Sequence, residues 1–408
     1  MRRFFSGPCT EMPATFLVGD VHDRLAELDD DSVDLILSSP PFLALRSYLP
    51  ADHPDKGKEI GSEPDPGVFV DVLCGVVDDL VRVLAPHGSI CFELGDTYAG
   101  GLGFQGVDDF AVNKGRQYWI TDSGTGPLRD KAGNGWPRPK SLALVPELFR
   151  ITLAYGRNPL TGKVWWEGTE RWMVRNVVRW VRPNPPVGAL GDKFRPATSE
   201  LVVFTRSPKR FFDLDAVRTE AQVQMGRAVQ GNNIKGSDEA SFRFAERIDS
   251  HPAGAPPLDW WKISPKGYPG AHYATFPDEL CVVPIKSMCP ERVCRTCGEP
   301  SRRIVERSRP VEPDDSQRIK HANGERPAPG RQDRAPEIGW EIDRETVGWS
   351  DCGHDDWRRG MVLDPFAGTG TTLAVATGHG RDAIGIDLDE SNADLAIERV
   401  GPLMLEVV

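Results

Sequence analysis

A strand, a glycine loop, a helix and a second strand follow one another near the end of the 408-residue chain, and this order constrains the fold more than any other feature. The apolar run 361–363 predicts a buried strand that ends on Asp364. The loop FAGTG follows with Gly368 and Gly370, TTLAVATGHG predicts a helix, and DAIGIDLD predicts a strand that carries Asp387. Such a βαβ unit indicates an α/β fold with a parallel sheet between layers of helices.

The same unit predicts a ligand that has a ribose and a positive charge. Asp387 lies 23 positions after Asp364, near the interval of about 20 residues at which an acid of such units binds a ribose. The pattern GTGTT is shorter than that of a pyrophosphate cradle, and Asp364 disfavours a phosphate beside the loop. A carboxylate there suits an α-amino group, so we expect S-adenosylmethionine rather than NAD. A tight turn without a ligand is the alternative.

A second buried strand is predicted at 33–37, within SVDLILSSPPF, and it stops on two consecutive prolines. Pro40 and Pro41 have no backbone N–H group and cannot continue the ladder. Ser39 and Phe42 should therefore lie on a rigid turn at the carboxyl end of a strand, the edge at which open α/β sheets bind ligands. An ordinary strand-ending turn is the alternative, because proline pairs are common in turns.

Together the two segments resemble the signature pair of amino-methyltransferases that act on DNA bases, with SPPF as [SDN]PP[YF] and DPFAGTGTT as DPF.G.GTT. The tetrapeptide comes first and the loop last, which resembles the β group of cytosine-N4 and adenine-N6 DNA methyltransferases, whose two halves are permuted. GDTY and HYATFPDEL also resemble family segments, and the similarity covers roughly residues 15–215 and 270–400. The resemblance implies a Rossmann-like, S-adenosylmethionine-dependent methyltransferase fold in the permuted order.

The resemblance also implies roles for individual residues. The Ser39 hydroxyl and the Pro40 carbonyl would accept hydrogen bonds from the exocyclic amino group of a flipped base, Pro41 would stiffen the turn, and Phe42 would stack on the base. A serine in first place is commoner in the cytosine-N4 enzymes, so we expect cytosine N4. The alternatives are adenine N6, an RNA or protein substrate, and an inactive DNA-binding relic. The expected cofactor contacts are Asp20, Phe276, Asp364, Pro365, Phe366, Gly368, Gly370 and Asp387.

The centre of the chain is basic although the whole chain has a net charge of -11. Between Arg129 and Arg210 there are 16 basic and 6 acidic residues, so we expect this region to contact double-stranded DNA. Four arginines at spacings of 4, 4 and 3 would share one face of a helix, although part of this segment is a strand in the family. A solvated face paired with acids is the alternative. The predicted DNA contacts are Arg171, Arg175, Arg179, Arg182, Lys193 and Arg195.

Cysteine and histidine residues form two close pairs, within CRTC at 294–297 and CGH at 352–354. Cys294, Cys297, Cys352 and His354 have the spacing of a structural zinc knuckle, with Cys289 as a substitute ligand and free thiols as the alternative. The chain has no run of about 18 apolar residues and no secretory pattern at its start. We therefore expect a cytoplasmic protein, bacterial or phage-encoded, whose cysteines are reduced or metal-bound.

We expect five segments along the chain. Residues 1–215 would form the catalytic half with its basic segment, 216–268 a target-recognition insertion, 269–290 a cofactor-side segment, 291–358 an insertion with the zinc knuckle and a disordered linker, and 359–408 the half that binds S-adenosylmethionine. Residues 100–140 are a second candidate for target recognition. No segment resembles a nuclease, so any cognate restriction endonuclease would be a separate protein.

Overall fold

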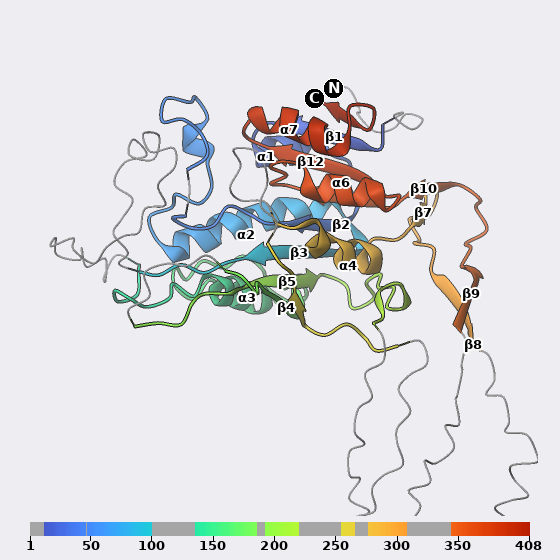
Figure 1. Ribbon diagram of the computed structural model, residues 1–408, viewed down its shortest axis with the longest axis horizontal. Helices are drawn as coiled ribbons and strands as arrows, with labels where there is room; N and C mark the ends of the chain where they lie inside the picture. Colours follow the sequence, from blue (N-terminus) through green and yellow to red (C-terminus); the bar gives the residue numbers. More distant parts are fainter. Residues whose placement is uncertain are drawn as a thin grey trace, which may run out of the picture. The chain divides into compact units, whose positions relative to one another are not determined.

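The computed structural model describes residues 12–45, 47–99, 135–185, 192–219, 254–265, 276–307 and 344–408. The chain divides into two compact units, of which the first comprises 1–213, 258–301 and 352–408. This first unit contains a nine-stranded sheet with helices on both faces (Figure 1). The predicted α/β, Rossmann-like fold class is therefore confirmed. None of the helices in the described ranges is long and apolar enough to cross a membrane.

The sheet has the order β13-β1-β12-β11-β2-β3-β5-β4-β6. Strand pairs from β13 to β3 are parallel, β5 is antiparallel to both β3 and β4, and β6 is parallel to β4. The predicted strands in 33–37, 361–364 and 382–387 are confirmed as β2, β11 and β12. The bounds are β1 Ala14–Val18, β2 Val33–Ser38, β3 Leu84–Leu94, β4 Met173–Val181, β5 Thr198–Thr205, β6 Trp260–Lys262, β11 Met361–Asp364, β12 Asp382–Asp387 and β13 Leu405–Val407.

Helices bury both faces of this sheet. The core on one face contains Ile36 of β2, and the core on the other contains Leu35 and Leu37. Successive side chains of a strand point to opposite faces, so the apolar run of β2 is what a central parallel strand requires. The helices of the first core are α1 Val21–Glu27, α2 Pro66–Val83 and α3 Val145–Tyr155, and those of the second are α4 Asp278–Met288, α6 Thr371–Gly378 and α7 Ser391–Val400. Two short 3-10 helices are Lys56–Lys58 and Gly168–Glu170.

The neighbours β11 and β2 come from opposite ends of the chain. From β11 the chain continues through α6 to β12, on one side of this pair, and from β2 it continues through α2 to β3, on the other side. Because the two connections diverge, a crevice is left at the carboxyl ends of β11 and β2. Open α/β sheets bind their ligands at such a switch point.

The amino-terminal end of β2 holds a buried ionic cluster. Asp34 has no solvent exposure, and its carboxylate accepts hydrogen bonds from Arg358 at 2.5 and 3.0 Å and from the Met361 N–H at 2.7 Å, while His87 Nε2 lies 3.0 Å away. Burial alone would raise the pKa of Asp34, but the His87 hydrogen bond and the Arg358 charge hold it below its usual value. The cluster ties β10 (Trp357–Arg359) to β2 and β11.

Removing Arg358 should destabilise the protein. Arg358→Ala leaves the Asp34 carboxylate buried without its cation, and we expect the free energy of unfolding to fall by about 3 kcal/mol. Arg359→Ala is the matched control, because its side chain is 60% exposed and its ion pair with Asp382 is long, at 3.6 Å, so a loss below about 1 kcal/mol is expected. Urea unfolding measures both variants, and equal losses would contradict a special role for Arg358.

The second unit comprises 214–257 and 302–351. Its described part contains the 3-10 helix Asp215–Val217 and the antiparallel pair β8 Arg303–Arg307 and β9 Arg344–Trp349. The antiparallel ribbon of β7 (Arg292–Cys294) with β10 belongs to the first unit instead. Only the middle of the predicted insertion 291–358 thus falls in the second unit. Most of the recognition segments predicted in 216–268 and 100–140, and of the predicted linker, lies outside the described residues.

Candidate active site

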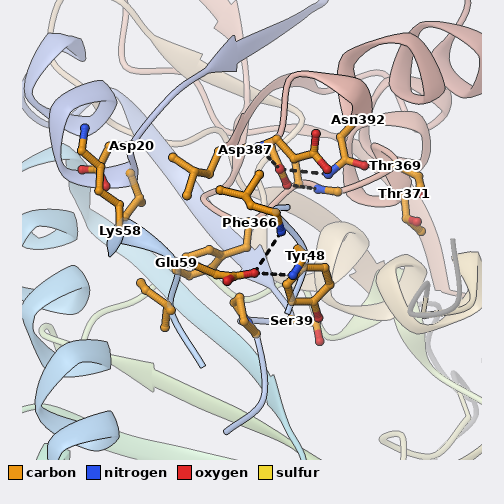
Figure 2. Close-up of a pocket in the computed structure, with 18 of the residues that line it drawn as sticks. Asp20, Ser39, Tyr48, Lys58, Glu59, Phe366, Thr369, Thr371, Asp387 and Asn392 are labelled. Carbon is orange, nitrogen blue, oxygen red and sulfur yellow. Dashed lines mark hydrogen bonds between the residues drawn. The ribbon is translucent and has the colours of Figure 1, made fainter. Parts of the chain in front are cut away.

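A pocket lies at the carboxyl ends of β1, β2, β11 and β12 (Figure 2). Its empty space is about 940 Å³, open solvent included. The loops after these four strands form its walls together with segment 48–60. The predicted cofactor loop and the predicted catalytic turn therefore face the same space. The predicted site residues that line it are Asp20, Ser39, Pro41, Phe276, Phe366, Gly368 and Asp387.

Asp387 closes the glycine loop from the end of β12 (Figure 2). Its Oδ2 accepts a hydrogen bond from the Gly368 N–H at 2.7 Å, and its Oδ1 accepts from the Asp389 N–H and from Asn392 Nδ2, both at 2.9 Å. Burial raises the pKa of Asp387, and these hydrogen bonds oppose that shift. A carboxylate offers about four acceptor positions, so one remains for a donor in the pocket.

Gly370 does not line the pocket, in contrast to its predicted cofactor contact. It begins α6 with a φ of 74°, and a Cβ at this position would lie 3.0 Å from the Ala396 side chain of α7. The glycine thus supplies a left-handed residue and a close approach of two helices. Its role in the site is indirect, through the position of α6.

Asp364 and Pro365 also lie outside the pocket wall, and Asp364 is only 1% exposed. Oδ1 of Asp364 accepts hydrogen bonds from Ser38 Oγ at 2.5 Å and from the Phe366 N–H at 3.1 Å. Oδ2 is buried and has no hydrogen-bond partner among the described residues. Burial raises the pKa of Asp364 to about 6. A buried acceptor without a partner costs free energy unless a bound ligand supplies a donor.

The turn of SPPF presents Ser39 to a buried glutamate. Ser39 Oγ donates a hydrogen bond of 2.7 Å to Oε2 of Glu93, which lies on β3 and is 5% exposed. Burial raises the pKa of Glu93, opposed by the hydrogen bonds of Ser199 and Ser39 and by the charge of Arg182. Because the hydroxyl hydrogen points to Glu93, the lone pairs of Oγ stay available as acceptors.

Phe42 is half-buried beside the pocket rather than in its wall. A Cβ at Gly95 would come within 2.6 Å of the Phe42 ring, so glycine is the residue that leaves room for the ring there. Gly61 has a φ of 105°, and a Cβ at this position would lie 3.0 Å from the Phe42 carbonyl oxygen. Pro40 is buried and likewise absent from the pocket wall. Two glycines distant in sequence thus leave room for the SPPF turn.

Two features of the site escaped the sequence analysis, one behind Ser39 and one in the pocket wall. Glu93 is one of them, and its only signal was an acidic residue near the end of an apolar strand. The other is segment 48–60, in which Glu59 accepts hydrogen bonds from the backbone N–H groups of Tyr48 (Figure 2) and Leu49. Glu59 also pairs with Lys56. These bonds fold the segment back on itself against the pocket. Tyr48, Lys58 and Glu59 add polar groups to the wall.

The arginines predicted to contact DNA do not form a helical stripe, and the segment contains a strand, as the resemblance to the family indicated. Arg175 and Arg179 lie on β4, which pairs with β5 over eight residues and has a bulge at Arg175. Strand pairing in the sheet therefore overrides the helical spacing. Arg179 forms an ion pair of 2.6 Å with the buried Glu200. The exposed members of the set are Arg171, Arg175, Arg179, Lys193 and Arg195.

Arg182 points inward rather than to solvent. Its guanidinium stacks 4.9 Å from the Trp180 ring and donates to Ser199 Oγ at 3.3 Å. Ser199 in turn forms a hydrogen bond with Glu93, and the charge of Arg182 opposes the rise in the pKa of Glu93. This arginine therefore supports the acid behind Ser39, and its predicted phosphate contact loses support.

The four predicted metal ligands come together in the first unit. Their ligand atoms all lie within 4.8 Å of one another, although Cys294 and His354 are 60 positions apart. Cys289, the predicted substitute ligand, is not a member of this cluster. It is fully buried, and its thiol donates to the Pro290 carbonyl at 3.8 Å.

Comparison with known proteins defines the class. The family model of the N6 and N4 DNA methylases matches residues 33–293 and 357–398, and the chain belongs to this family. It is 31% identical over 236 residues to the Type II methyltransferase M.SfiI of Streptomyces fimbriatus, across 57% of this chain and 46% of that protein. The chain thus spans less than half the length of that relative. M.SmaI of Serratia marcescens is 24% identical across 94% of this chain and 89% of its own length.

Two solved structures are also similar to the chain. PvuII DNA methyltransferase, described as cytosine-N4-specific, has 14% identity and a TM-score of 0.45, across 95% of this chain and 88% of its own. A DNA modification methylase of Thermus thermophilus, TTHA0409, solved with S-adenosyl-L-methionine, has 17% identity and a TM-score of 0.43, across 97% of this chain and 99% of its own. The resemblance predicted from SPPF and DPFAGTGTT is confirmed by the family match.

Proposed function

We propose that the chain transfers a methyl group from S-adenosylmethionine to the N4 amino group of a cytosine in double-stranded DNA. One observation supports this most: Ser39 of the SPPF turn and Asp387, which closes the glycine loop from the end of β12, line a single pocket. The relatives are Type II methyltransferases, so the modification would protect DNA from a separate cognate endonuclease. Such a protein would work in the cytoplasm of a bacterium, from a bacterial or a phage gene.

The pocket fits the parts of S-adenosylmethionine. The free acceptor position of Asp387 suits the ribose hydroxyls. Asp364 is buried outside the pocket wall, and its unpaired Oδ2 would accept from the α-amino group. Phe366 and Phe276 supply apolar wall, and Asp20 lies at the end where the adenine would bind. When bound, this molecule supplies an electrophilic methyl group on a sulfonium. The remaining chemistry belongs to residues of the chain.

Ser39 and Glu93 would activate the amino group. The lone pairs of Ser39 Oγ and the Pro40 carbonyl accept hydrogen bonds from the NH2 group, which draws its nitrogen away from conjugation with the ring. As the N–C bond forms and the methyl–sulfur bond breaks, the nitrogen becomes positive and loses one proton. Ser39 can accept this proton while its own hydrogen passes to Glu93 along the 2.7 Å bond. The raised pKa of Glu93 makes it a better proton acceptor than an exposed glutamate.

The target base would reach this pocket by leaving the duplex, with Phe42 stacking on it. Exposed basic residues around β4 and the 192–197 loop would contact phosphates, namely Arg171, Arg175, Lys193 and Arg195. Serine in first place in SPPF favours cytosine over adenine, as in the family. Adenine N6 is the second candidate because the same acceptors suit its amino group.

The function is tested by expressing the chain in a host that lacks DNA methylation. Single-molecule sequencing of the genomic DNA should detect N4-methylcytosine in one short motif. A Ser39→Ala variant expressed at the same level is the control and should leave that motif unmodified. N6-methyladenine in the motif would overturn the choice of base. Unmodified DNA from soluble wild-type protein would overturn the proposed function.

Glu93→Gln should slow methyl transfer without weakening cofactor binding. The amide keeps the shape but cannot accept a proton, so we expect kcat to fall by about 10². The acidic limb of the kcat–pH profile, where protonation of Glu93 ends activity in the wild type, should disappear. Glu200→Gln is the matched control, because Glu200 is a buried glutamate on β5 that pairs with Arg150 and Arg179 instead of Ser39. Similar rate losses in both variants would contradict the role of Glu93.

Binding of S-adenosylmethionine should weaken in acid. The pKa of Asp364 is about 6 in the free protein, and only the carboxylate attracts an ammonium group. The Kd measured by calorimetry should therefore be nearly constant above pH 6 and rise towards tenfold per pH unit below it. Asp364→Asn should bind more weakly at pH 8 and lose this dependence. A wild-type Kd that stays constant from pH 8 to pH 5 would contradict the contact.

A further inference from the structure

We propose that Cys294, Cys297, Cys352 and His354 bind one zinc ion in a closed tetrahedral shell, and that this ion joins the two strands of the β7–β10 ribbon, which carries Arg358. The four ligand atoms lie within 4.8 Å of one another, and Cys294 Sγ is 3.5 Å from His354 Nδ1. Zinc bonds of about 2.3 Å to sulfur and about 2.0 Å to nitrogen place such a pair about 3.5 Å apart in a tetrahedron. The distances thus already have the scale of a zinc site.

Both ligand pairs lie on turns shaped for a metal. Gly298 follows the first pair with a φ of 72°, and its N–H bonds the Cys294 carbonyl at 2.9 Å. Gly353 separates Cys352 from His354 with a φ of 81°, and Asp355 follows with a φ of 48°. Left-handed residues reverse the chain tightly, so two ligands from each turn point to one centre. A left-handed aspartate is uncommon and indicates that the second turn is held in place.

The donor set selects zinc and a structural role. Thiolate and imidazole ligands in a tetrahedral arrangement favour zinc over magnesium or calcium, which prefer oxygen ligands. Four protein ligands fill the shell and leave no position for water or substrate. Three thiolates around a divalent ion leave one net negative charge on the site. On binding, the three thiol protons pass to solvent.

The ion would hold a ribbon that is weak by itself. β7 and β10 pair over only three residues each, and an isolated two-stranded ribbon of this size is marginal in water. The ribbon nevertheless carries Arg358, the cation that neutralises the buried Asp34. The two ligand pairs also flank the point where the chain leaves the first unit after Ser301 and returns at Cys352. A zinc ion that joins the two ligand pairs would hold the chain at both of these points. It would also keep Arg358 of β10 beside Asp34.

Zinc at this site would stabilise the fold and would take no part in methyl transfer. None of the four ligands lines the pocket, and Asp34 lies at the opposite end of β2 from Ser39. We therefore expect the loss of zinc to lower the melting temperature while the Kd for S-adenosylmethionine, measured below the transition, changes by less than about twofold.

The experiment compares two cysteine variants of the full chain, purified without added metal. Mass spectrometry of the metal should find about one zinc per wild-type chain. Cys297→Ala should lose most of this zinc and melt several degrees lower, although Cys297 is exposed and its truncation removes little packing. Cys289→Ala is the matched control, since its thiol is buried outside the cluster, and it should keep its zinc.

If Cys297→Ala does not fold, a second measurement tests the proposal on the wild-type protein. A chelator added to the wild-type protein should lower its melting temperature, and zinc, but not magnesium, should restore it. Wild-type protein that stays below about a tenth of a zinc per chain after incubation with zinc would overturn the proposal. A disulfide between Cys294 and Cys297 under reducing purification would also overturn it, as would equal zinc content in wild type and Cys297→Ala.

Discussion

A hydrogen bond of 2.5 Å from Ser38 Oγ to Asp364 Oδ1 joins residues 326 positions apart, and the active site depends on it. Ser38 is the residue before Ser39, the proposed catalytic serine, and Asp364 is the last residue of β11. The parallel pairing of β11 with β2 brings them together. This bond therefore fixes the distance between the SPPF turn and the glycine loop. Methyl transfer is sensitive to that distance, because reacting groups must be aligned within about an ångström.

The buried carboxylates near the two ends of β2 differ in their hydrogen-bond partners and in the direction of their pKa shifts. At the amino-terminal end, Asp34 has hydrogen-bond partners for both oxygens and a depressed pKa, as in a structural ion pair. At the carboxyl end, Asp364 keeps an oxygen without a partner among the described residues, and Glu93 and Asp364 have raised pKa values. Shifted carboxylates gathered around one pocket are typical of a functional site. The strand thus separates a cluster with a lowered pKa from carboxylates with raised pKa values, to which we assign the proposed chemistry.

Local sequence predicted the parts of this fold whose signals are local. β2, β11, α6 and β12 followed from apolar runs, glycines and prolines, and seven of the predicted site residues line the pocket. The arginine spacing suits a helix, but the segment contains β4, because pairing of β4 with β5 outweighs the helical pattern. Glu93 and the Asp34–Arg358 pair could not be found from sequence, because their partners lie 54 and 324 positions away. Such contacts can be recognised only once the order of the strands in the sheet is known.

The two halves of the chain line one pocket, and the proposed function places methylation of a DNA amino group in it. The most direct measurement incubates the purified protein with duplex DNA and S-adenosylmethionine carrying a deuterated methyl group, then analyses the nucleosides by mass spectrometry. The proposed function predicts deuterated N4-methylcytosine, and Ser39→Ala should abolish it. Protein that binds the cofactor but leaves every nucleoside of the DNA without the deuterated methyl group would contradict the account.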